Sequence, residues 1–123
     1  MRIEVSNGEI IDKLTIIQIK LERIKDPAKI KNLRKEFEEL AGATKSIMDT
    51  TDQLYKSLYD INCELWDIED HIRDLERKKD FGDDFIATAR SVYFKNDTRS
   101  EIKKAINLKT GSGLIEEKSY EKY

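Results

Sequence analysis

The chain has 123 residues, enough for one domain with a core of modest size. Charged residues make up 39% of it and hydrophobic residues 38%, with one proline, and this composition is typical of long amphipathic helices. The net charge of −2 excludes an overall attraction to nucleic acid, and no apolar run is long enough to span a membrane. We therefore expect a soluble, cytoplasmic protein with neither nucleic acid nor membrane as a partner.

The N-terminal part of the chain predicts a short arm followed by a helix. Residues 1–6 form an extended arm, since apolar and charged side chains alternate there. Ser6 precedes Glu9 by three positions, which is the pattern of a capping box at a helix start. The helix over about 7–25 is apolar on more than one face, so we expect it to pack between two neighbours. Asp26-Pro27 then ends this helix and begins the next one.

A heptad pattern of apolar residues covers the middle of the chain. From residue 27 these residues alternate by three and four positions, in one register, for more than six heptads. The preserved register favours one helix from about 27 to 79, although Gly42 and two threonines at core positions leave open a break near Gly42. A monomer rarely exposes an apolar seam of this length, so we predict a homodimer through the long helix. The predicted interface consists of core residues of the best heptads: Leu54, Leu58, Ile61, Leu65, Ile68 and Ile72.

The C-terminal third predicts two short helices and an irregular end. We expect helices over about 84–94 and 98–109, separated by a turn at Lys95-Asn96-Asp97, and an irregular tail over 111–123. The predicted fold is therefore all-α and forms a single domain over 1–123. It is a helical hairpin with a long heptad-patterned helix, followed by two short C-terminal helices.

Two pairs of carboxylates form the first candidate site. Glu36-x-x-Glu39 and Glu64-x-x-Asp67 resemble the acidic signature of MazG-type all-α nucleotide pyrophosphohydrolases, and this resemblance implies Mg²⁺ held against a triphosphate. Both pairs occupy the same heptad positions, so on a continuous helix they would lie about 42 Å apart. They can meet only if the helix breaks near Gly42 or across an antiparallel dimer. A solvated helix face is the preferred interpretation of these residues.

Other kinds of catalytic residue are not predicted. His71 is the only histidine and Cys63 the only cysteine, so neither a histidine-based metal site nor a catalytic triad can be assembled within one chain. A basic cluster with aromatic neighbours lies in the C-terminal third, and such a cluster near a helix N-terminus can bind phosphate. Internal ion pairs with the acidic middle of the chain are the preferred interpretation. The cluster consists of Arg90, Lys95, Arg99, Lys103 and Lys104.

Four sequence segments can be compared with known families. They are residues 6–16 (SNGEIIDKLTI), 65–73 (LWDIEDHIR), 92–99 (VYFKNDTR) and 116–120 (EEKSY). In this order and at this total length they resemble a family of small uncharacterised bacterial and phage proteins, a helical domain of unknown function. The resemblance implies a self-contained helical domain and no particular activity. It draws attention to six polar residues: Glu9, Asp12, Lys13, Asn96, Asp97 and Arg99.

The preferred function is a non-catalytic helical assembly or protein–protein interaction module, dimeric through the long helix. It needs no cofactor and no metal, and its partner is a second copy or another protein. The alternative from a different class is a Mg²⁺-dependent nucleotide hydrolase that uses the four carboxylates. A third is a protein that binds an anion or a nucleotide-sugar. The candidate binding residues are Glu9, Asp12, Lys13, Asn96, Asp97, Arg99 and Lys103.

Overall fold

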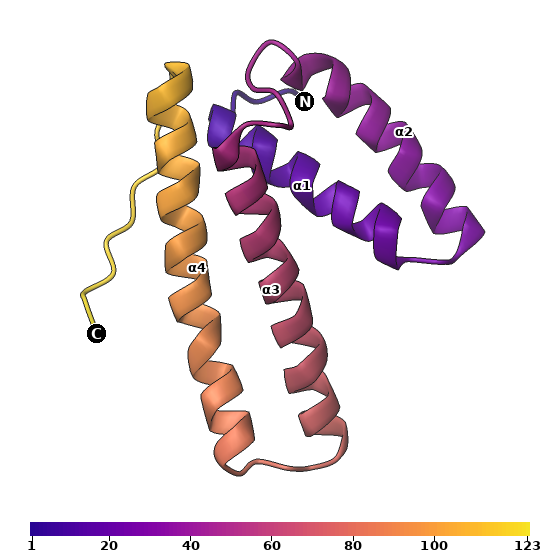
Figure 1. Cartoon of the computed structure of the whole chain (residues 1–123), viewed down its shortest axis with the longest axis vertical. Helices are drawn as coiled ribbons and strands as arrows, with labels where there is room; N and C mark the ends of the chain where they lie inside the picture. The colour runs from indigo at the N-terminus through magenta and orange to yellow at the C-terminus, as the bar shows by residue number, and fades with distance from the viewer.

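The computed structural model describes all 123 residues and contains four helices and no strand. The helices are α1 (Asn7–Arg23), α2 (Pro27–Thr44), α3 (Gln53–Arg77) and α4 (Asp83–Thr110). They form two hairpins, α1–α2 and α3–α4, and α1 packs against both helices of the second hairpin (Figure 1). The all-helical fold predicted from the sequence is confirmed. None of the helices is long and apolar enough to cross a membrane.

The start of α1 and its junction with α2 follow the predicted capping residues. Ser6 is the N-cap of α1, where its Oγ accepts a hydrogen bond of 3.2 Å from the Glu9 N–H. Asp26 is the N-cap of α2 and accepts a hydrogen bond of 3.0 Å from the Ala28 N–H, with Pro27 inside the first turn. Because α2, α3 and α4 all pack on α1, this helix is buried on several sides, as its apolar faces predicted.

The long helix predicted over 27–79 is wrong, because the structure divides it into α2 and α3. Residues 45–52 form a loop of turns between them, a few residues beyond Gly42. Polar side chains of this loop bind the backbone in place of helical hydrogen bonds. Asp52, the N-cap of α3, accepts a hydrogen bond of 2.9 Å from the Leu54 N–H. The heptad spacing in the sequence continues across the break, and apolar residues of both α2 and α3 pack into one core.

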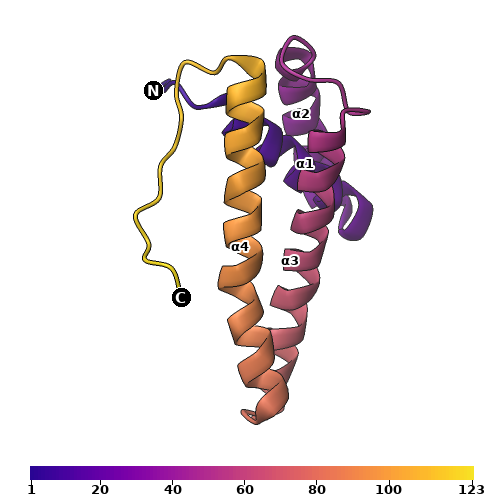
Figure 2. The ribbon, with the colours of Figure 1, turned by 60° about the vertical axis from the view of Figure 1, so that its left-hand side comes forward.

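The two short helices predicted over 84–94 and 98–109 are also wrong, because α4 is one continuous helix. Asn and Asp in its middle disfavour a helix by only about 0.7 kcal/mol each, and contacts with other helices override that preference. The predicted end is confirmed, since Gly111 follows α4 in the left-handed conformation with φ of 65°. Residues 111–123, called here the C-terminal segment, are irregular and run back along α4 (Figure 2).

The hydrophobic core lies where α1 crosses the α3–α4 hairpin. The remaining half of that hairpin extends beyond α1 and α2 as a pair of helices with no third helix against it (Figures 1 and 2). We call this part, residues 68–92, the projecting hairpin. The buried members of the core are Ile11, Leu14, Met48, Tyr55, Leu58, Ile61 and Ile106.

Candidate functional site

A buried ion pair joins α1 to α4. The Asp12 side chain is 2% exposed, and Arg99 donates to it through Nε, at 2.9 Å, and through Nη2. Asn62 on α3 donates to the same carboxylate at 2.9 Å and to Thr15 Oγ1 at 2.9 Å. The hydrogen bonds to Asp12 raise the pKa of Arg99 against the opposing effect of burial, so the guanidinium stays charged. No buried side-chain polar atom lacks a partner, so the network is fully satisfied.

A second ion pair lies one helical turn further along α4. Lys103 is 15% exposed and donates to Glu9 Oε2 at 2.6 Å, and its Nζ lies 3.6 Å from Glu116 of the C-terminal segment. Glu116 also accepts a hydrogen bond of 3.1 Å from the buried Ser6 hydroxyl. Burial raises the pKa of Glu116, but the charge of Lys103 and the Ser6 hydrogen bond outweigh it and lower that pKa. Glu116 is therefore held as a carboxylate against α1 and α4.

The N-terminus of α1 is held by the far end of α4. Asn107, 2% exposed, accepts a hydrogen bond of 2.6 Å from the Gly8 N–H, and Ser112 Oγ accepts one of 3.0 Å from the Asn7 N–H. These bonds satisfy N–H groups that a helix start leaves without an intrahelical partner. Gly8 permits the close approach, because a Cβ there would lie 2.5 Å from the Lys103 carbonyl oxygen. The helix N-terminus, a general anion site, is thus occupied by the chain itself.

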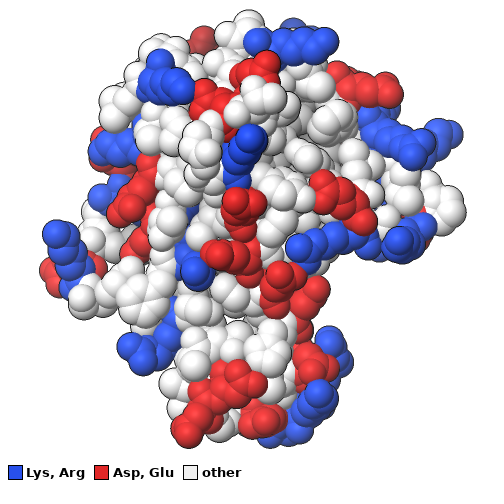
Figure 3. All heavy atoms as spheres, in the orientation of Figure 1, with Lys and Arg blue, Asp and Glu red and all other residues white.

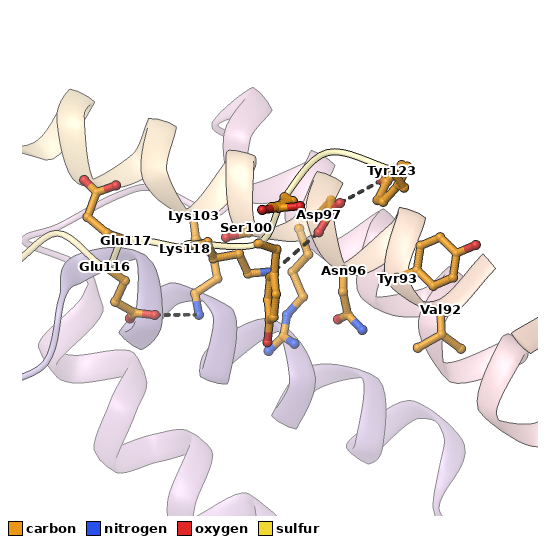
Figure 4. Close-up of a pocket in the computed structure, with 13 residues that line it drawn as sticks. Val92, Tyr93, Asn96, Asp97, Ser100, Lys103, Glu116, Glu117, Lys118 and Tyr123 are labelled. Carbon is orange, nitrogen blue, oxygen red and sulfur yellow. Dashed lines mark hydrogen bonds and ion pairs between the residues drawn. The ribbon is translucent and has the colours of Figure 1, made fainter. Parts of the chain in front are cut away.

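Two hollows flank Asn96 and Arg99. One, of about 530 Å³, lies beneath the C-terminal segment and is lined mainly by polar side chains (Figure 4). The other, of about 620 Å³, lies between α1, α3 and α4 at the base of the projecting hairpin. We call this second hollow the apolar groove. Its apolar walls are formed by Ile16, Ile19, Leu65, Trp66, Ile68 and Val92.

The structure brings six of the seven candidate binding residues together and separates Lys13. Lys13 faces α2, where its Nζ lies 3.2 Å from Glu36. Asp97 lines the hollow beneath the C-terminal segment and accepts a hydrogen bond of 2.7 Å from the Tyr123 hydroxyl. The six residues around the buried ion pairs and the two hollows are Glu9, Asp12, Asn96, Asp97, Arg99 and Lys103.

Three residues that complete the site are absent from the predicted set. Asn62 and Asn107 are 6% and 2% exposed, and each directly follows a core isoleucine. An asparagine next to a core position of a patterned helix is a signal that could have found both. Glu116 belongs to a segment that the family resemblance singled out, but nothing in its sequence context places it against α1.

The basic cluster of the C-terminal third is mostly neutralised within the chain. Lys95 lies 3.1 Å from Glu64 in the acidic middle, as the preferred interpretation predicted. Arg99 and Lys103 pair with α1 instead, and Lys104 pairs with Glu117 of the C-terminal segment at 3.2 Å. Internal pairing is therefore confirmed, with different partners for three of the cations. Arg90 is the member of the cluster without an ion pair, and the other four cations are paired within the chain.

The four carboxylates of the hydrolase alternative do not converge. The chain does break near Gly42, yet α2 packs closely on α1 and not on α3. Three of the carboxylates form ion pairs with different cations, in the pairs Glu36–Lys13, Glu64–Lys95 and Asp67–Arg23, and Glu39 lies with Glu36 on α2. No group of three or more His, Cys, Asp or Glu side chains is arranged to hold a metal ion. Within one chain, therefore, the break near Gly42 does not bring the two carboxylate pairs together.

Only part of the predicted dimer interface is accessible to a second chain. Leu58 and Ile61 are 0% and 6% exposed and belong to the core of the single chain, and Leu54 packs against that core. In the single chain α1 and the loop after α2 already cover Leu58 and Ile61, so these two are not accessible to a second chain, whereas Leu54 is partly exposed. The remaining predicted interface residues, Leu65, Ile68 and Ile72, are partly exposed.

The comparisons with known proteins give one match. The model of a family of unknown function, DUF6165, matches residues 1–123, and the chain therefore belongs to this family. No curated protein and no solved structure matches the chain.

Proposed function

We propose that the chain is a helical interaction module without catalysis of its own, and that it forms a homodimer through the projecting hairpin and the apolar groove at its base. The observation that supports this proposal is an apolar seam between two helices that lacks a third helix to cover it. Ile68 and Ile72 lie on this seam and are partly exposed. The groove at the base of this seam is lined half by apolar and half by polar or charged side chains, and it opens to solvent.

Two helices cannot bury all sides of the seam between them. An amphipathic helix in a globular protein turns an apolar stripe toward a core, and a packed core needs neighbours on more than one side. In the upper half of the hairpin α1 supplies that neighbour, and Leu58 is fully buried. In the projecting hairpin no segment of the chain does so. Each Å² of apolar surface covered by a partner would contribute about 25 cal/mol, before the entropic cost of association.

A second copy is the partner that the charges favour. A two-fold symmetric interface uses the same patch on both chains, so the patch must be complementary to itself. The edge of the groove carries both signs of charge, with Glu69 and Asp70 beside Arg73 on α3. Arg73 lies 3.2 Å from Glu69, and this exposed pair can exchange partners across an interface. Figure 3 shows uncharged surface in the middle of the projecting hairpin and charged residues along its edges.

Two matched substitutions test the proposal. Ile68→Glu places a charge in the groove and should reduce the mass in solution from two chains to one, with the helical signal unchanged. Leu108→Glu is the control, because Leu108 is 65% exposed on α4 and lies outside the groove. It should leave the mass at two chains. Size exclusion with light scattering measures both variants, and an equal mass for the two would count against the groove as the interface.

Trp66 gives a second readout without any label. It is the only tryptophan of the chain and lines the groove. Dilution should therefore shift its emission to longer wavelength as the dimer separates and water reaches the ring. The Ile68→Glu variant should show the long-wavelength emission at every concentration. Emission that stays constant over the concentration range of a mass change would place the contact elsewhere.

A further inference from the structure

The C-terminal segment is attached to α4 by side chains alone. Beyond Ser112, whose N–H donates to the Asn107 carbonyl at 2.9 Å, no backbone–backbone hydrogen bond involves the segment. Every residue from 113 to 123 is exposed. Detaching a strand from a sheet breaks a series of backbone hydrogen bonds. Detaching this segment from α4 breaks only a few side-chain contacts.

The contacts form a row along one face of α4. Glu116 binds Ser6 and Lys103, and the next residue, Glu117, lies 3.2 Å from Lys104. At the other end the Tyr123 hydroxyl donates to Asp97 at 2.7 Å. The Tyr123 ring packs against Phe94 and Tyr93, with centroid distances of 4.6 Å and 5.2 Å. Carboxylates therefore fill one end of this face and an aromatic ring fills the other.

The segment does not fill the surface beneath it. A hollow of about 530 Å³ lies on one side of the segment (Figure 4), and another of about 600 Å³ lies on the other side. Tyr120, between the two ends, is 82% exposed. The ion pair of Lys118 with Asp97, at 3.6 Å, is the anchor between the two ends, so the segment is held by a few side chains with open space beside them.

We propose that this face of α4 is a docking site for an extended acidic and aromatic segment of a partner protein, and that the C-terminal segment is its intramolecular competitor. The partner segment has two adjacent glutamates and an aromatic residue six positions after the second of them. This is the spacing of Glu116, Glu117 and Tyr123. The surface borders the apolar groove, but its anchoring residues Asp97, Lys103 and Lys104 lie outside that groove, so the inference does not depend on the proposed dimer.

A peptide fits this face better than a small anion does. Lys103 is 15% exposed and already paired with Glu9, so a free phosphate would find one half-neutralised cation and Lys104. The aromatic pair Tyr93 and Phe94 lies ten residues along α4 from Lys103 and Lys104, about 15 Å at 1.5 Å per residue. Only a ligand that spans this distance can use both ends of the site.

The attached C-terminal segment determines how tightly a partner segment must bind in order to displace it. A segment linked by a short connection has an effective concentration in the millimolar range. If the attached segment itself has an intrinsic dissociation constant near 0.1 mM for this face, a partner peptide would bind the intact chain about tenfold more weakly than the open face. Removing the anchors of the attached segment should restore the stronger binding.

The test uses the full chain and a labelled peptide, LIEEKSYEKY, which copies residues 114–123. Fluorescence anisotropy measures its binding to the wild-type chain and to the variant Glu116→Ala/Glu117→Ala/Tyr123→Ala, whose three changes lie on exposed residues. The triple variant should bind the peptide at least tenfold more tightly than the wild type. The single variant Tyr123→Ala should show a smaller gain in the same direction. A peptide of the same composition in scrambled order is the control and should bind neither protein.

Exchanging the charges of one ion pair between protein and peptide tests whether the peptide binds at this face of α4. Lys104→Glu, added to the triple variant, should weaken peptide binding, and a peptide with lysine in place of Glu117 should recover it. Absence of binding to the triple variant, or equal binding by wild type and triple variant, would overturn the proposal. So would equal binding of the scrambled peptide. Loss of a dimer in the triple variant, measured by light scattering, would show instead that the segment belongs to the contact between two copies.

Discussion

Replacing Arg99 by alanine tests the buried ion pair between α1 and α4. The change removes both hydrogen bonds from the guanidinium and leaves the Asp12 carboxylate, 2% exposed, with Asn62 as its remaining side-chain donor from another helix. Removing one partner of a buried pair costs about 3–5 kcal/mol, because the other charge stays desolvated. Arg99 itself is 29% exposed, so we expect the lower end of that range, about 3 kcal/mol. The total free energy of unfolding of a domain of this size is about 5–15 kcal/mol, so this loss is a large part of it.

Urea unfolding followed by circular dichroism, at one fixed protein concentration, measures the loss. Lys13→Ala is the matched control, since Lys13 forms an exposed pair with Glu36 outside the apolar groove and its loss should cost no more than about 1 kcal/mol. The double variant Asp12→Asn/Arg99→Met should be more stable than Arg99→Ala, because no buried charge is left unpaired. If Arg99→Ala costs less than 1 kcal/mol, the argument that Asp12 is desolvated in the folded chain is refuted.

Three further predictions concern local geometry and pH. Gly8→Ala should lower stability by about 1–3 kcal/mol in thermal unfolding, since its Cβ would lie 2.5 Å from the Lys103 carbonyl oxygen. Gly42→Ala should raise stability by up to about 1 kcal/mol in the same assay, because its Cβ meets nothing within 4 Å and alanine favours the helix. Docking of the C-terminal segment should weaken below about pH 4, because the pKa of Glu116 is lowered in the docked state. The contribution of Glu116 to docking is fully present above the ordinary glutamate pKa of about 4.3, and it is lost as the pH falls through the lowered pKa. Docking should also weaken above about pH 10, because the hydrogen bond to Asp97 raises the pKa of Tyr123 to about 12, and NMR signals of the Tyr123 ring report both limits.

Local signals in the sequence predicted the helix boundaries well where a capping residue acts alone. Ser6, Asp26 and Gly111 each act through their own side chain or backbone conformation, so nearby residues were enough to identify them. The break between α2 and α3 was harder to predict. The heptad spacing in the sequence happens to continue through the loop over residues 45–52, so the preserved phase did not distinguish one helix from two.

The uninterrupted course of α4 depends on contacts that are distant in sequence. Lys95 is the first residue of the predicted turn and Arg99 lies just after it, and each forms an ion pair with another helix. The need for such distant contacts also limited what could be predicted of the site. The polar residues of α1 and α4 were identified, but their pairing and the part played by Glu116 follow from tertiary packing that no local pattern encodes.

The mass of the wild-type chain in solution tests the proposed interaction module most directly. Size exclusion with light scattering at high micromolar concentration should give twice the chain mass of 14.4 kDa, falling toward one chain on dilution. The change in mass should coincide with the shift in Trp66 emission, because that ring lines the groove. A mass of one chain throughout the concentration range would contradict the account, and the projecting hairpin would then be stable with its seam open to water.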